Sequence, residues 1–206
     1  MTAHAVARNS KRQAIIETAE RLFAAHGYDA TSTARIAHEA GVPSGLVFYH
    51  FATKLDLLLA IVHERPTPGE VLRSVTRSRS VRGRLRAVVT AMAEELERNR
   101  AARIIVFREA QARPEIAARA AELYAEATTS VADVLSGADD IVADPARVRT
   151  AAELVVSRVF LDIVALGRAD TAAKRHAAMI DLVAESLTTP SPHQPPRHDR
   201  RDGGRA

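Results

Sequence analysis

Residues 43–51 read PSGLVFYHF and gather side chains suited to hydrogen bonding and aromatic contact rather than to bond cleavage. Phe48, Tyr49 and Phe51 are three of the eight aromatic residues of the chain, which has five Phe, three Tyr and no Trp. Serine, tyrosine and histidine side chains can each donate and accept hydrogen bonds. Gly45 lacks a Cβ and therefore lets another backbone approach closely. The segment therefore concentrates rings that are scarce elsewhere in the chain.

The rest of the chain lacks the residue spacings that catalysis or metal binding requires. Cysteine is absent, which excludes disulfides and thiolate metal sites. The eight histidines show no metal-ligand spacing, such as a helical i,i+4 pair with a third ligand. No glycine-rich phosphate loop and no nucleophile motif occurs. We therefore expect a protein that binds no metal or cofactor. We also expect that it is not an enzyme, since an α-helical enzyme would need a polar catalytic cluster.

The composition predicts that these side chains are carried by helices. The 206 residues are 47% hydrophobic and 26% charged, as in a globular protein. Alanine, leucine and arginine dominate, and no alternating β-branched run indicates a strand, so we expect an all-α fold. The N-terminus lacks the apolar core of a signal peptide, and no apolar run approaches the roughly 18 residues of a membrane span. We expect a cytoplasmic protein without membrane contact.

Four helices are predicted before residue 64. Ser10 and Gln13 have the spacing of a capping box, and His26-Gly27 ends the first helix. Ser32 or Thr33 caps a second helix, which stops at Gly41. A third short helix begins at Pro43 or Ser44 and ends near Phe51, and the fourth is capped by Thr53 with Asp56. A helix, a tight glycine turn and a second helix are typical both of a helix-turn-helix and of an ordinary helical hairpin.

The segment RPTPGE, residues 65–70, is a predicted joint between two parts of the chain. Longer helices are expected beyond it, at about 81–99, 102–112, 114–137, 145–167 and 171–187. From Thr188 the sequence is rich in proline and glycine without apolar periodicity, which predicts disorder. The expected organisation is therefore an N-terminal domain (1–64), a second helical domain (65–188) and a tail (189–206).

Charge is distributed unevenly along the chain. Residues 64–89 hold seven Arg against two Glu, whereas residues 90–189 hold twelve basic and sixteen acidic residues. A basic N-terminal half fits a polyanion as partner. Charge alone favours the simpler interpretation, in which an arginine-rich face, including the stretch Arg73–Arg86, is merely solvated.

Residues 11–62 closely resemble the DNA-binding domain of transcriptional repressors of the TetR/AcrR family. The shared pattern comprises Ala19, Phe23, Gly27-Tyr28, Thr31-Ser32, Ile36-Ala37, Ala40-Gly41-Val42, Gly45, Tyr49-His50-Phe51, Lys54 and Leu57-Leu58. Matches this numerous at fixed spacing are highly specific. The remainder of the chain is similar to the family only in length, helical content and order.

The resemblance implies a three-helix helix-turn-helix domain whose recognition helix, residues 44–50, enters the major groove of double-stranded operator DNA. The residues expected to contact DNA are Thr31, Ser32, Thr33, Arg35, Ser44, Gly45, Leu46, Phe48, Tyr49, His50 and Lys54. Phe51 is expected in the core. For Phe48, a core position and a surface position are expected equally. The chain departs from the family pattern at Phe48, where Tyr is usual, and at Pro43, which replaces a capping Ser.

The resemblance also implies a C-terminal helical domain that binds a small-molecule effector and forms a homodimer through residues of about 145–187. A purely intrachain core is the alternative for those helices. Polar and aromatic residues within apolar runs are the expected effector contacts: Arg103, Phe107, Arg108, Tyr124, Arg158 and Asp162. Arg158 and Asp162 are four residues apart and are predicted to pair.

The expected function is that of a sequence-specific transcriptional regulator. The family's usual member is a repressor that its effector releases from a palindromic operator. Activation of transcription is left open as an alternative. The alternative is an all-α small-molecule-binding protein that has lost DNA binding, which the residues Phe48 and Pro43 keep open. The sequence does not identify the operator, the effector or the regulated genes.

Overall fold

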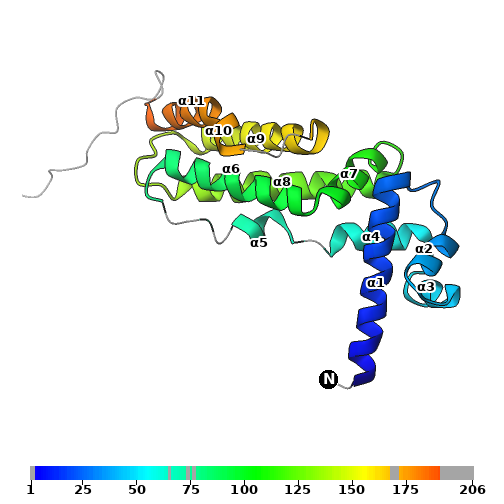
Figure 1. Ribbon diagram of the computed structural model, residues 1–206. Helices are drawn as coiled ribbons and strands as arrows, with labels where there is room; N and C mark the ends of the chain where they lie inside the picture. Colours follow the sequence, from blue (N-terminus) through cyan, green and yellow to red (C-terminus); the bar gives the residue numbers. More distant parts are fainter. Residues whose placement is uncertain (1–2, 65, 73–74, 76–77, 168–171, 191–206) are drawn as a thin grey trace, which may run out of the picture.

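The computed structural model describes residues 3–64, 66–72, 75, 78–167 and 172–190, and within these ranges the chain is helical without strands. The predicted all-α class is confirmed. Figure 1 shows a small N-terminal group of helices beside a larger layer of long helices. No single helix of the described ranges has the length and apolarity to cross a membrane, although the bent pair of residues 44–50 and 54–63 satisfies that criterion when taken together.

The N-terminal group contains α1 (Ala3–His26), α2 (Thr33–Glu39), α3 (Ser44–His50) and α4 (Lys54–His63). Figure 1 shows α1 projecting away from the rest of the molecule at its N-terminal end. The predicted start of this helix at Ser10 is wrong, because helical residues continue upstream to Ala3. Polar residues such as Ser10 and Gln13 can occupy exposed positions in the middle of a helix as well as positions at its cap.

Local caps explain why the short helices begin and end where they do. Gly27 and Gly41 have φ values of +86° and +64°, the left-handed conformation that glycine tolerates best, and they end α1 and α2 as predicted. Ser32 caps α2 with its side chain. Thr53 and Asp56 form a complete capping box at the start of α4. These caps and glycines set the ends of α1 and α2 and the start of α4.

The larger layer contains seven α-helices and one π-helical turn within the described residues. They are α5 (Pro68–Leu72), α6 (Val81–Arg98), α7 (Arg100–Glu109), α8 (Pro114–Ser136), α9 (Pro145–Phe160), η1 (Leu161–Ala165), α10 (Ala172–Arg175) and α11 (Ala177–Thr188).

Several of these elements differ from the predicted ranges, and α7 lies at Arg100–Glu109 rather than 102–112. The joint at 65–70 contains the start of the short helix α5, because Pro68 occupies a first-turn position where its missing N–H costs nothing. The helix predicted at 145–167 ends at Phe160 and continues as the turn η1. The last predicted helix is divided into α10 and α11 at His176. The predicted disordered tail lies mostly outside the described residues.

Two hydrophobic core clusters hold the helices together. The first, the C-terminal cluster, contains residues of α5, α6, α8, α9, η1 and α11, such as Leu85, Val131 and Val155. The second, the N-terminal cluster, contains Phe23, Ile36, Val47 and Leu58 together with residues of α7 and α8. Helices of the C-terminal half therefore complete the core of the N-terminal half, so residues 1–64 do not enclose their core by themselves.

Candidate nucleic-acid interface and internal cavity

Helix α3 is anchored by buried side chains and presents the others to solvent. Val47 is fully buried and Phe51, which follows the helix, is 4% exposed, as predicted. Phe48 and Tyr49 are 53% and 65% exposed, so Phe48 belongs to the surface rather than the core. Ser44 and Gly45 are exposed, and Leu46 is half-buried. The result is a short helix with its N-terminal end and two large rings directed outward.

His50 lies between the exposed and buried rings of this segment. Its ring centroid is 5.0 Å from that of Tyr49 and 6.2 Å from that of Phe51. The Arg12 guanidinium of α1 lies 5.2 Å from the Phe51 centroid. These contacts fix the C-terminal end of α3 against α1.

The start of α2 places the predicted phosphate ligands in different environments. Ser32 is exposed, and its Oγ accepts a hydrogen bond from the Arg35 backbone N–H at 3.1 Å. Thr33 is half-buried. Thr31 is fully buried, and its hydroxyl donates to the Gly27 carbonyl at 2.8 Å. The expected phosphate contact by the Thr31 side chain is therefore wrong, because this hydroxyl closes the loop between α1 and α2.

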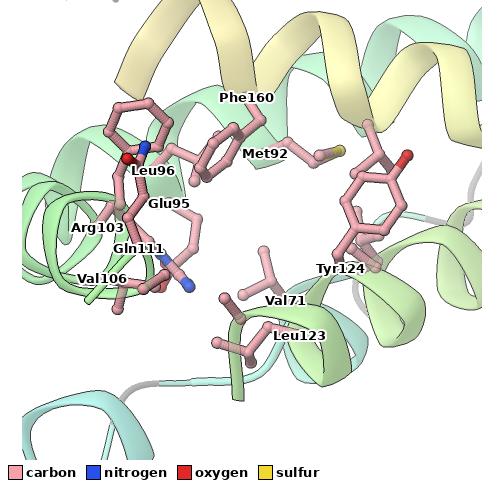
Figure 2. Close-up of a pocket in the computed structure, with 16 residues that line it drawn as sticks. Val71, Met92, Glu95, Leu96, Arg103, Val106, Gln111, Leu123, Tyr124 and Phe160 are labelled. Atoms are coloured by element: carbon pink, nitrogen blue, oxygen red, sulfur yellow. The ribbon is translucent and has the colours of Figure 1, made fainter. Parts of the chain in front are cut away.

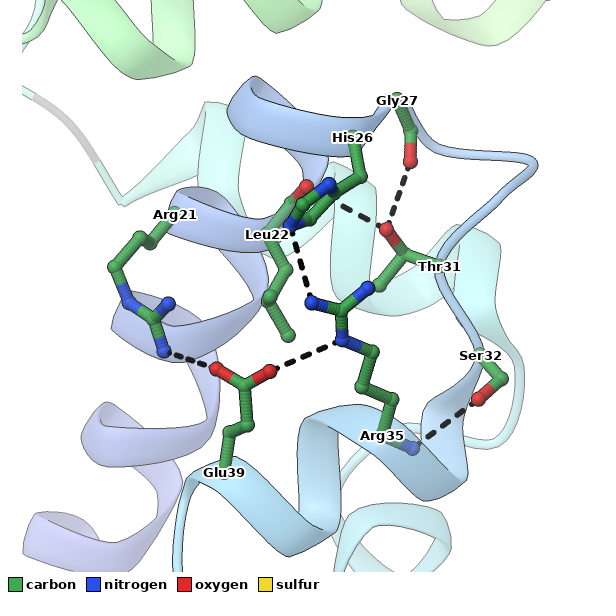
Figure 3. A network of polar contacts seen from close by, with 8 residues as sticks. All are labelled: Arg21, Leu22, His26, Gly27, Thr31, Ser32, Arg35 and Glu39. Atoms are coloured by element: carbon green, nitrogen blue, oxygen red, sulfur yellow. Dashed lines mark hydrogen bonds and ion pairs between the residues drawn. The ribbon is translucent and has the colours of Figure 1, made fainter.

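Arg35 belongs to a polar network that joins α1 to α2 (Figure 3). Its Nε lies 3.0 Å from Glu39 Oε1, and Arg21 of α1 contacts the other carboxylate oxygen of Glu39 at 2.7 Å. Arg35 Nη2 lies 3.1 Å from His26 Nε2. Hydrogen bonds from Arg21 first, and from Arg35, lower the pKa of Glu39 below its ordinary value. Arg35 remains 43% exposed at its side chain, so it can face both Glu39 and solvent.

Lys54 is held by the protein rather than extended into solvent. Its Nζ donates to the backbone carbonyls of Tyr28 at 2.9 Å and Thr31 at 3.1 Å, and it lies 4.2 Å from the Tyr28 ring centroid. An ammonium has three protons, so these carbonyls use two of them. The expected role of Lys54 as a phosphate ligand needs correction: its main contacts tie the start of α4 to the loop before α2.

A cavity of about 350 Å³ lies among α5, α6, α7, α8 and α9, within the size range of small-molecule sites. Its wall is mostly apolar and consists of Val71, Leu72, Met92, Glu95, Leu96, Arg103, Val106, Phe107, Ala110, Gln111, Ala120, Leu123, Tyr124, Ala127, Val156 and Phe160. Figure 2 shows Glu95, Arg103 and Gln111 gathered at one side of the cavity and Tyr124 at the other. The site therefore combines an apolar body with polar groups at its ends.

Only some of the predicted effector residues reach this cavity. Arg103, Phe107 and Tyr124 line it. Arg108 lies elsewhere, and its Nη1 donates to the Ala24 carbonyl at 3.2 Å. Arg158 and Asp162 form the predicted pair at 3.2 Å but do not line the cavity. Asp162 is fully buried and lies 3.0 Å from His176 Nε2. Asp162 therefore contacts other protein side chains and not the cavity.

The polar cavity residues that the sequence did not reveal are Glu95 and Gln111. Glu95 is 4% exposed and accepts hydrogen bonds from Arg98 and Asn99. Glu95 lies three residues after Met92 and seven after Val88, on the buried face of α6, so helical spacing could have indicated it. Gln111 lies in the turn after α7, where no periodicity indicates its direction. At the opposite side, the Tyr124 hydroxyl is 2.8 Å from Ser157 Oγ of α9.

Large apolar side chains remain exposed on the last helices of the described chain. Leu154 and Leu182 are 59% and 69% exposed, and Leu161 and Leu166 are 45% and 48% exposed. Leu154 and Leu161 are seven residues apart, which places them on one face of α9 and η1. We define these four residues as the apolar face.

Comparison with known proteins identifies the N-terminal half. Residues 15–61 match the family model described as bacterial regulatory proteins, tetR family. The chain is 29% identical to the helix-turn-helix transcriptional activator FasR of Mycolicibacterium smegmatis over 143 residues, 68% of this chain and 65% of that one. It thus spans slightly less than two thirds of the length of FasR. A transcriptional repressor of Mycobacterium tuberculosis is 28% identical over 183 residues, 86% of this chain and 93% of the repressor.

Solved structures match the arrangement of the helices. A tetR-family regulatory protein from Rhodococcus has a TM-score of 0.67 at 24% identity, covering 86% of this chain and 96% of that protein. FadR of Bacillus subtilis, solved in complex with stearoyl-CoA, has a TM-score of 0.65 at 16% identity, covering 85% and 98%. At these identities the likeness to solved structures concerns the fold alone. Residues 15–61 therefore match the tetR family of bacterial regulatory proteins, and the helices of the chain are arranged as in solved members of that family.

Proposed function

We propose that this protein is a cytoplasmic, homodimeric transcriptional regulator that binds a palindromic operator and leaves it when a small molecule occupies the internal cavity. The exposed surface of α3 carries this proposal. Ser44 and Gly45 stand at the helix end that enters a major groove in this motif, and Tyr49 is a large exposed group with a polar tip. Val47 and Phe51 hold this surface on the N-terminal cluster.

The structure supports a division of labour among the proposed DNA contacts. Ser44, Gly45 and Leu46 are proposed to meet base edges, where a hydroxyl, a close backbone and an apolar group can each discriminate. Ser32, Thr33, Arg35, Tyr49 and His50 are proposed to hold phosphates, which position the helix. Phe48 is exposed, so the ring can pack against the sugar-phosphate backbone although it lacks a hydroxyl.

Dimerisation is proposed through the apolar face of α9, η1 and α11. Leaving four leucines in water is unfavourable, because burying one such side chain contributes about 1.5–3 kcal/mol. A symmetric contact would bury two copies of this face. It would also place two α3 helices at a fixed separation, as a palindromic site requires.

The effector is proposed to be a largely apolar molecule with a hydrogen-bonding group at one end. The apolar wall would bury its body, and Glu95, Arg103 and Gln111 would contact its polar end. The stearoyl-CoA complex of FadR makes acyl compounds a reasonable first probe, although that protein shares only the fold. Because the relatives include an activator and a repressor, the fold does not fix the sign of regulation.

The test is selection of genomic DNA fragments by the purified protein, followed by affinity measurements on the enriched sequences. We expect an enriched palindrome whose binding Tyr49→Ala weakens, since the substitution removes an exposed contact without touching the core. Asp139→Ala is the control, because Asp139 is exposed outside both the helix-turn-helix and the apolar face, where it lies 3.1 Å from Arg79. A folded protein that enriches no sequence would contradict the proposal and favour the small-molecule-binding alternative.

A further inference from the structure

Arg113, in the turn between α7 and α8, makes polar contacts with the DNA-binding half. Its Nη2 lies 2.6 Å from Asp29 Oδ1, and its Cζ lies 4.1 Å from the Tyr28 ring centroid. Its Nη1 also pairs with Glu109, the last residue of α7. The Arg113 side chain is only 18% exposed. One guanidinium therefore joins the end of α7 to the loop between α1 and α2.

The same tyrosine ring is shared with Lys54. Tyr28 is 8% exposed and receives Arg113 and Lys54 at 4.1 and 4.2 Å from its centroid. Lys54 in turn donates to the carbonyl of Thr31, the residue before the Ser32 cap of α2. Cation–π contacts and charge-assisted hydrogen bonds of this kind depend on close geometry. A displacement of Arg113 would therefore disturb the support of the first helix of the helix-turn-helix.

The other end of this series of contacts is the cavity. Phe107, Ala110 and Gln111 line it, and Gln111 precedes Arg113 by two residues. The turn between them is short and hydrogen-bonded, since the Arg113 N–H donates to the Glu109 carbonyl at 3.0 Å. Pro114 then begins α8. Movement of the cavity wall at Gln111 would thus reach Arg113 through a rigid turn.

The cavity also lies where the two core clusters meet. Val106 and Leu123 of its wall belong to the N-terminal cluster, whereas Met92, Leu96 and Val156 belong to the C-terminal cluster. An occupant would contact both clusters at once. Close-packed interiors transmit such displacements rather than absorb them.

We propose that Arg113 is the positioning residue that transmits occupancy of the cavity to α2 and α3, through Tyr28 and Lys54. This inference rests on the proposed function and adds the route by which the effector acts. Arg113 itself touches neither the cavity nor, in this proposal, the DNA. It sets the orientation of the DNA-binding helices relative to α7.

The test uses the absence of cysteine from the chain. Ala127→Cys introduces a single thiol into the cavity wall, and benzyl methanethiosulfonate then fills the cavity with a covalent apolar group whose attachment mass spectrometry verifies. Operator affinity is measured with and without the label, with Arg113 present and in Arg113→Ala. We expect the label to weaken operator binding by about tenfold with Arg113 present and by less than about threefold without it.

Two matched variants accompany this comparison. Arg119→Ala removes an arginine of similar burial, 16% exposed, which pairs with Glu122 on its own helix, and its response to the label should equal that of the unchanged background. Arg113→Lys retains a charge without the planar fork, so it should give an intermediate response; it also serves if Arg113→Ala does not fold.

The possible outcomes separate this inference from the proposed function. Equal weakening with and without Arg113 overturns the relay and leaves control by the cavity intact. Loss of the label's effect in every background overturns both control by the cavity and the relay, while operator binding by unlabelled protein still supports a DNA-binding regulator. A salt dependence reduced by about one phosphate contact in unlabelled Arg113→Ala would show that Arg113 touches DNA, which would also overturn the proposal.

Discussion

Val47 and Tyr49 are separated by one residue and have opposite surroundings. Val47 is fully buried in the N-terminal cluster, whereas Tyr49 is 65% exposed on the same helix. The sequence alone suggested the composition of this surface through its clustered rings, but it left Phe48 undecided. The structure resolves that question because the tight turn at Gly41 fixes which face of α3 meets α1.

These neighbouring positions give the first prediction. Val47→Ala should lower the free energy of unfolding by about 1–3 kcal/mol, because it removes buried methyl groups and leaves a cavity. Tyr49→Ala should change it by less than about 0.5 kcal/mol, as is usual at exposed sites, while weakening DNA binding. Urea unfolding and operator titration of both variants check the pair. Equal loss of stability in the two variants would contradict the proposed orientation of α3.

Glu39 gives a prediction about pH. Its pKa is lowered in the folded state, so its contribution to stability is present above its ordinary pKa of 4.5 and is lost as the pH falls through the lowered value. Glu39→Gln should therefore be less stable than the unchanged protein at pH 6, and the difference should shrink below about pH 4.5. Urea midpoints of both proteins between pH 6 and 3 measure this. A difference independent of pH would exclude the ion pairs with Arg21 and Arg35 as its cause.

Among the elements, the boundaries set by local chemistry were predictable and those set by packing were not. The caps at Ser32 and Thr53, the glycine stops at Gly27 and Gly41, and the start of α8 at Pro114 follow from neighbouring residues. The break between α9 and η1 and the division at His176 depend on contacts across the fold. Asp162 illustrates the reason. Its neighbour His176 belongs to a different helical segment, and helical spacing relates only residues within one helix.

The fully buried carboxylate of Asp162 ties η1 to the start of α11. Asp162→Ala should lower the free energy of unfolding by about 1–3 kcal/mol, because it removes the buried carboxylate that lies 3.0 Å from the Nε2 of the buried His176. The exposed pair of Arg149 and Glu153 provides the control, and Arg149→Ala should cost less than about 1 kcal/mol. Chemical denaturation of both variants decides the matter, and comparable small losses would mean that Asp162 is not part of the support of α11.

The basic stretch at 73–86 also has a local explanation in the residues described. Arg84 donates to the Ser78 and Val134 carbonyls at 2.8 and 2.7 Å and thereby joins α6 to the end of α8. Arg82 pairs with Asp181, and Arg79 lies 3.1 Å from Asp139. Arg79 and Arg82 thus pair with acids of the C-terminal half, and Arg84 pairs with backbone carbonyls. The charge asymmetry of the sequence is therefore no independent sign of a DNA contact there.

For the whole molecule, the prediction concerns assembly. Leu182→Glu places a charge in the apolar face and should convert a dimer into a monomer, as sedimentation would show. Operator affinity should then fall by about a hundredfold or more, because the two half-sites are no longer bound by one particle. Glu94→Lys, an exposed charge change on α6 outside the apolar face, should preserve the dimer. A Leu182→Glu protein that remains dimeric would place the interface elsewhere.

The cavity between the two core clusters has one more consequence, for the stability of the protein with a compound bound. A compound that fits the cavity adds dispersion contacts to its wall. A compound that occupies it at a hundred times its dissociation constant would add about 2.7 kcal/mol to the stability of the fold. The melting temperature of the protein is therefore itself a detector for its natural effector, and metabolites can be ranked by the heat needed to unfold their complexes before any gene under its control is known.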